Sequence, residues 1–102
     1  MSINPLPIAC SLTTAELQER RKTVLHRVRL KVVEVRELDE GYAYSFASEA
    51  GRLAELAELV DLERQCCPFM SFSIKVEQNN GPIWLELTGP EGTKAFLEAV
   101  FA

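Results

Sequence analysis

The chain has 102 residues, of which 47% are hydrophobic and 25% are charged, so it is long enough for one globular domain with a buried core. Its formal net charge of −4 disfavours direct binding to the phosphate backbone of a nucleic acid. No apolar run approaches the roughly 18 residues of a membrane span, and the N-terminus lacks the pattern of a signal peptide. Three cysteines, two of them adjacent, do not make a secreted disulfide framework, so we expect a cytoplasmic protein with reduced thiols.

The N-terminal part predicts an extended segment followed by a helix. Residues 1–12 contain two prolines and are expected to form an extended lead-in. Thr13 and Glu16 then have the spacing of a capping box, in which each side chain satisfies a backbone N–H group of the other residue. This pattern predicts a helix over residues 14–28, with Thr13 as its N-cap.

Two segments alternate apolar and polar residues with a period of two, which is typical of half-buried strands. Residues 33–46 predict one hairpin with a turn at 39–41, and residues 72–87 predict a second with a turn at 79–82. Alternation places one set of side chains toward the helices: Val33, Val35, Phe72, Ile74, Val76, Ile83, Leu85 and Leu87. Trp84 is then expected on the opposite face, where an exposed aromatic side chain would suggest a partner surface.

Two further helices follow the two predicted hairpins. Ser48 is expected to cap a helix that runs from residue 49 to 66 or 67, and Pro90 suits the first position of a last helix. The resulting order, α-ββα-ββα, predicts a single α+β domain over residues 1–102. We expect a four-stranded antiparallel sheet with the helices packed mainly on one face.

The end of the second predicted helix carries an acidic residue on its apolar stripe. Glu63 lies one helical turn before Cys67, on the side that is expected to face the core. A buried carboxylate requires a cation, a metal ion or a proton, because burial without a partner is too costly. If the first two helices pack together, Arg21 or the neighbouring Arg20 is placed to form a structural ion pair with Glu63.

The three cysteines, Cys10, Cys66 and Cys67, form a candidate site for a thiophilic ion. Adjacent cysteines make a poor disulfide with each other, but two or three thiolates suit arsenite-like, mercuric or cuprous ions. Antiparallel packing of the first two helices would bring Cys10 toward the adjacent pair, with Glu63 as a candidate fourth ligand. Zinc accepts three thiolates and a carboxylate, although the usual Cys-x₂-Cys spacing is absent.

Other readings of the thiols stay open. Free cysteine often packs as a small hydrophobic residue, and the C-terminal end of a helix raises the pKa of a thiol. Redox or nucleophilic chemistry is the third reading, but the single histidine, His26, points away from the apolar stripe. The sequence therefore favours a small soft-metal or metalloid binding protein. The alternative is a non-catalytic dimeric interaction module whose cysteines only pack, and no pattern supports an enzyme.

The same region resembles a known group of proteins. Cys10-Ser-Leu near the start, and the box Glu63-Arg-Gln-Cys-Cys-Pro-Phe, are similar to the hallmarks of a family of small uncharacterised bacterial proteins. The resemblance spans nearly the whole chain from Cys10. It implies that Cys10, Glu63, Arg64, Cys66 and Cys67 occur together, without giving the reason. Similar segments occur near heavy-metal-responsive regulators, and the resemblance itself assigns no activity.

Overall fold

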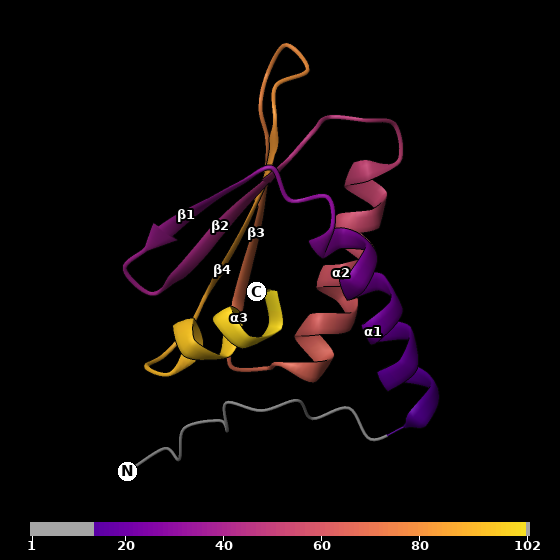
Figure 1. The fold of residues 1–102 in the computed structure, drawn as a ribbon, viewed down its shortest axis with the longest axis vertical. Coiled ribbons are helices and arrows are strands. Elements are labelled where there is room, and N and C mark those ends of the chain that lie inside the picture. Colours follow the sequence, from indigo (N-terminus) through magenta and orange to yellow (C-terminus); the bar gives the residue numbers. More distant parts are fainter. Residues whose placement is uncertain (1–13, 102) are drawn as a thin grey trace.

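The computed structural model describes residues 14–101, which fold into helices on a four-stranded sheet (Figure 1). The elements in chain order are α1 (Ala15–Arg29), β1 (Glu34–Leu38), β2 (Gly41–Phe46), α2 (Arg52–Cys66), β3 (Ser71–Val76), β4 (Ile83–Thr88) and α3 (Thr93–Phe101). The strands are antiparallel and lie in the order β1-β2-β4-β3. The predicted α+β class and the order α-ββα-ββα are confirmed, whereas the expected lead-in at 1–12 lies outside the described residues.

α1 begins one residue later than predicted and is anchored at both ends. Its N-cap is Thr14, whose Oγ1 accepts a hydrogen bond from the N–H of Leu17 at 3.2 Å. The predicted cap, Thr13, lies outside the described residues. At the other end, Nη1 of Arg29 donates to the carbonyl of Val100 at 3.3 Å. This contact places a cation at the carboxyl end of α3, where it opposes the negative end of the helix dipole.

The other two helices begin later than predicted because a glycine interrupts the backbone before each of them. α2 starts after Gly51, which has a φ of 83°, rather than after Ser48. α3 starts after Gly92, which has a φ of 98°, rather than at Pro90. Residues with positive φ cannot continue a right-handed helix. Among the described residues, no helix is both long enough and apolar enough to cross a bilayer.

One face of the sheet forms the core with the helices. Across the central strands Tyr44 lies opposite Leu85, and Leu85 lies opposite Ile74 in β3. The buried side chains of this core include Val28, Phe46, Leu56, Leu59, Ile83, Leu85, Leu87 and Leu97. The predicted inward positions on β4 are therefore buried. Ile74 and Phe72 on β3 are partly buried and pack against the same core.

Three valines that were predicted to face the core are exposed to solvent. Val33 is 71% exposed, and Val35 and Val76 are each 54% exposed. Val35 lines a hollow together with side chains of α3, so it does point to the helix side of the sheet. Val76 is the last residue of β3. Val33 and Val35 are open because the helices pack on the other strands, with α3 against β2 and α2 against β3. The edge strand β1 is left uncovered.

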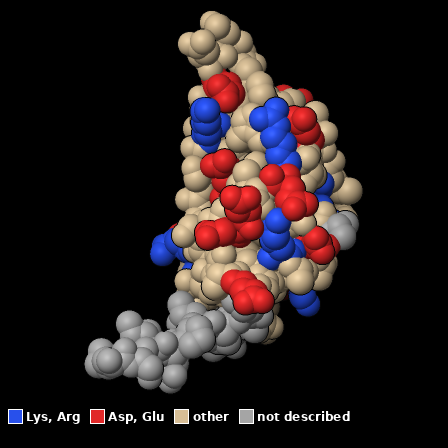
Figure 2. Space-filling view, turned by 90° about the vertical axis from the view of Figure 1, so that its left-hand side faces the viewer, with Lys and Arg blue, Asp and Glu red and all other residues tan. Residues whose placement is uncertain are grey.

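The opposite face of the sheet carries charged side chains that cover Trp84. The register places Trp84 beside Ser45 and Lys75 on this face, as predicted, but its exposure is only 9%. The guanidinium carbon of Arg36 lies 4.4 Å from the centre of the Trp84 ring, a cation–π contact. The expectation that Trp84 is an exposed partner surface is therefore wrong. Figure 2, which views the side of the molecule where β1 lies, shows Lys or Arg and Asp or Glu side chains intermixed.

Candidate functional site

α1 and α2 meet at a buried ion pair. Nε of Arg21 lies 2.6 Å from Oε1 of Glu63, and Nη2 of Arg21 donates to Oε2 at 3.4 Å. Glu63 is 1% exposed, so this two-point, charge-assisted contact neutralises a carboxylate that is removed from water. The second predicted cation, Arg20, pairs instead with Glu58 on the surface at 3.3 Å.

The same carboxylate contacts the thiol of Cys67. Sγ of Cys67 donates a hydrogen bond to Oε2 of Glu63 over 3.6 Å, and Cys67 is fully buried. The pKa of the Cys67 thiol is raised to about 12, mainly by burial and also by the negative charge of Glu63, while the positive charge of Arg21 offsets part of this rise. Cys67 is therefore protonated at neutral pH, and a protonated thiol is a poor nucleophile and a poor metal ligand.

The two adjacent cysteines differ in their chemical state. α2 ends at Cys66, and Cys67 leaves the helical conformation with φ −123° and ψ 70° before Pro68. Cys66 is fully buried and disulfide-bonded, whereas Cys67 is a free thiol. The expectation of three reduced thiols is therefore wrong for Cys66. The third cysteine, Cys10, lies outside the described residues.

The predicted metal ligands do not form a metal site in the part of the chain that the structure describes. Over residues 14–101, no three His, Cys, Asp or Glu side chains gather in a group that could hold a metal ion. Glu63 already binds Arg21, and Cys66 is engaged in a disulfide. A site made of Cys10, Cys66, Cys67 and Glu63 stays a prediction.

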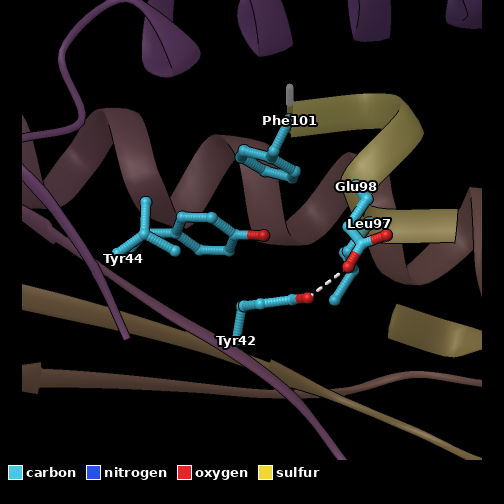
Figure 3. A pocket seen from close by; sticks show the side chains of 6 residues that line it. Tyr42, Tyr44, Leu97, Glu98 and Phe101 are labelled. Carbon is cyan, nitrogen blue, oxygen red and sulfur yellow. Dashed lines mark hydrogen bonds between the residues drawn. The ribbon is translucent and has the colours of Figure 1, made fainter. Parts of the chain in front are cut away.

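A second candidate site lies beside the uncovered strand β1. It is a hollow of about 240 Å³ lined by Val35, Tyr42, Tyr44, Leu97, Glu98 and Phe101 (Figure 3). Tyr44 stacks on Phe101, with ring centres 4.6 Å apart and planes 20° apart. The hydroxyl of Tyr42 donates to the carboxylate of Glu98, and this bond is the main cause that raises the pKa of Tyr42 to about 12. The walls are mostly apolar, with one carboxylate at the rim.

Sequence reasoning missed this hollow because it assigned Val35 to the core. The available signal was the flanking pair Glu34 and Arg36, since charged neighbours are common on strands at the edge of a sheet. The same alternation also occurs in strands with only one buried face. Pattern alone therefore could not distinguish an edge strand from a covered one.

The candidate sites are thus a buried, charge-compensated cluster around Glu63 and an open apolar surface around Val35. No protein-family model matches the chain, and no curated protein or solved structure matches it, so its place in the bacterial family of the Glu63-Arg-Gln-Cys-Cys-Pro-Phe box stays a prediction.

Proposed function

We propose that the chain is a non-catalytic interaction module that binds another polypeptide at the β1 edge. By the β1 edge we mean Val35 and the outward backbone groups of β1, together with Val33, which directly precedes the strand. The observation that carries the proposal is the high exposure of these two valines, one in the strand at the end of the sheet and one directly before it. An open edge is a template for an added strand, which would supply backbone hydrogen bonds and cover the valines. Covering each valine would contribute on the order of 1 kcal/mol.

The cluster around Glu63 supports the non-catalytic part of this proposal. The charge of Glu63 is engaged by Arg21, and the Cys67 thiol has a raised pKa and no exposed surface. The ion pair holds α1 against α2, and a carboxylate that is already paired and a buried, protonated thiol are poorly suited to attack a substrate. A cytoplasmic location and the absence of direct nucleic-acid contact, both predicted from the sequence, belong to the proposal.

Site-specific crosslinking tests the proposed surface. A photo-reactive amino acid is placed at position 33 or 35 in cells that produce the protein, and its adducts are identified by mass spectrometry. Leu53 is the matched control, since it is an apolar side chain on α2 that is 47% exposed. We expect a defined polypeptide adduct from positions 33 and 35 and none from position 53. Equal labelling at all positions, or no adduct at the β1 edge, would remove the proposal.

A second candidate function is the binding of a thiophilic ion by the reduced form of the cysteine cluster. The observation that favours it is the 3.6 Å contact between Sγ of Cys67 and Oε2 of Glu63, directly beside Cys66. The ligands would be Cys10, Cys66 and Cys67, with Glu63 as the fourth. A phosphine or dithiol must first reduce the disulfide of Cys66, and Cys67 must lose its proton to the solvent.

Native mass spectrometry tests this second candidate. Protein reduced with a phosphine is titrated with zinc or with arsenite, and the number of bound ions is counted. We expect one equivalent, bound more tightly as the pH rises because the thiols must be deprotonated. Cys10→Ser, Cys66→Ser and Cys67→Ser should each weaken it. Unchanged binding in all three variants, or no binding to the reduced wild type, excludes a cysteine site.

A further inference from the structure

β1 has one edge that pairs with β2 and one edge that is open. Leu38 and Gly41 are the pair that closes the two-residue turn between these strands. Successive residues of a strand direct their backbone N–H and C=O groups alternately toward and away from the neighbouring strand. Leu38 directs its groups toward β2 at the turn, so Arg36, two residues earlier, does the same. Val35 and Glu37 then direct theirs outward. Figure 1 shows no described helix or strand beyond this side of β1.

The open part of the ladder is short and centred on Val35. The N–H of Val33 donates to the carbonyl of Ser45 at 2.8 Å, although the register partner of Ser45 is Glu34. Val33, which directly precedes β1, and Glu34, the first residue of β1, therefore both face Ser45 of β2, which is a β-bulge. The bulge turns the N–H of Val33 inward, so an added strand would find its outward N–H groups at Val35 and beyond.

The charges on either side of Val35 are complementary to those of a second, antiparallel copy of the same strand. Glu34 and Arg36 lie on the same face of the sheet, and their side chains contact each other at 3.6 Å. If a second β1 pairs antiparallel with the first and Val35 faces Val35, each Glu34 faces an Arg36 of the other copy. Opposite charges at directly facing positions stabilise a strand pair. The two-fold axis is normal to the sheet, so both sets of helices stay on one side.

Neighbouring registers and the other edge of the sheet lack this complementarity. A two-fold axis at Glu34 would set two carboxylates against each other, and an axis at Arg36 would set two guanidinium groups against each other. On β3 the corresponding axis at Ile74 would set Ser73 against Lys75, and a lysine on an edge strand discourages pairing. The charge pattern thus selects one edge and one register.

We infer that the polypeptide bound at the β1 edge is a second copy of this chain, paired antiparallel through a two-fold axis at Val35; this inference rests on the proposed function. The two sheets then form one continuous sheet. The two Val35 side chains lie together on the helix side, and the hollows that they line meet across the axis. The ladder is short and the bulge limits it, so the interface is at the small end of specific interfaces. We expect a rapidly exchanging dimer with a Kd in the micromolar range.

Charge exchange at the β1 edge tests the inference by analytical ultracentrifugation of the full chain. Glu34→Arg alone and Arg36→Glu alone each create two like-charge pairs across the axis, so each should raise the Kd by about tenfold. An equimolar mixture of these two variants should recover the wild-type Kd, because every facing pair is again opposite in charge. Lys75→Glu on β3 is the matched control and should leave the Kd unchanged.

Amide exchange gives an independent reading of the register. The N–H of Val35 should exchange more slowly as the protein concentration rises, because the second copy accepts its hydrogen bond. The proposed register is wrong if neither single substitution changes the Kd of the dimer, or if the mixture of the two variants does not recover the wild-type Kd. A chain that stays monomeric up to about 1 mM, well above a micromolar Kd, overturns the second copy as partner. Adducts of another protein from positions 33 and 35 would still support the proposed function.

Discussion

Arg21 on α1 and Glu63 on α2 meet as a buried pair, although 42 positions separate them in the chain. Both side chains come from regular helix, and their contact sets how α1 lies on α2. The carboxylate also accepts the hydrogen of Cys67, so one acidic group serves an arginine and a thiol. The stability of this part of the fold should therefore depend on the charge of Glu63.

Glu63→Gln should lower the free energy of unfolding by about 3–5 kcal/mol, because it leaves a mostly buried arginine without its counter-charge. Urea unfolding measures the change. Glu58→Gln is the matched control: it removes an acidic partner from Arg20 on the surface, and it should cost less than about 1 kcal/mol. In a double-mutant cycle, Arg21→Met should show coupling to Glu63→Gln, and independent effects would contradict the pair as the cause.

The pH dependence of stability should report the Cys67 thiol. Its pKa is raised from the usual 9.0 to about 12, so the folded chain holds this proton after the unfolded chain has lost it. The stabilisation is complete below about pH 9 and is lost as the pH rises through the folded pKa. The free energy of unfolding should fall more between about pH 8 and about pH 11 in the wild type than in Cys67→Ser, whose hydroxyl does not titrate there. Parallel curves for both proteins would count against this assignment.

Thr93→Val should stabilise the fold. Oγ1 of Thr93 is fully buried and has no hydrogen-bond partner among residues 14–101, so its desolvation is uncompensated. Replacing the hydroxyl by a methyl group of similar size should raise the free energy of unfolding by about 1 kcal/mol. Thr93→Ser is the control, because it keeps the hydroxyl and loses a buried methyl group, and it should destabilise by a similar amount. Destabilisation by valine would reveal a hydrogen bond to this hydroxyl.

Gly41→Ala should destabilise the sheet much more than Gly51→Ala. A Cβ at Gly41 would lie 1.8 Å from the carbonyl oxygen of Leu87, so the β2–β4 pairing would have to open, at a cost of about 3 kcal/mol or more. A Cβ at Gly51 meets no atom within 4 Å, and only its φ of 83° is unfavourable, which costs about 1–2 kcal/mol. Thermal unfolding of both variants checks the order. Equal losses of stability in the two variants would show that β4 can move away from a Cβ at position 41 at little cost in free energy.

The strands of the sheet can be predicted well from the sequence because the alternation of apolar and polar residues is a local pattern. The alternation of Tyr42, Tyr44 and Phe46 follows from the two-residue period of a strand and needs no knowledge of the remaining chain. Alternation states which side of a strand is apolar, but it does not state whether a helix covers that side. Val35 and Leu85 share one pattern, and yet Val35 is open while Leu85 is fully buried. That difference depends on strand order.

The candidate site shows the same limit. A carboxylate at Glu63 on an apolar stripe requires a cation, and the periodicity of α1 narrows the choice to two neighbouring arginines. Which of them reaches Glu63 depends on how the helices rotate and tilt against each other, and Arg21 is the one that does. Whether Cys66 is a thiol or part of a disulfide depends on the redox environment and on a residue that is close in space. A local sequence pattern indicates neither of these.

The strand order β1-β2-β4-β3 also bears on how the chain folds during synthesis. Each hairpin forms from neighbouring segments of the chain. The pairing of β2 with β4 at the centre of the sheet, in which Gly41 faces Thr88 and Phe46 faces Ile83, can form only after β4 has been synthesised. Until that segment leaves the ribosome, β2 presents an unprotected apolar edge that other nascent chains can capture. The most vulnerable intermediate is therefore a chain that has completed α2 and lacks its last hairpin.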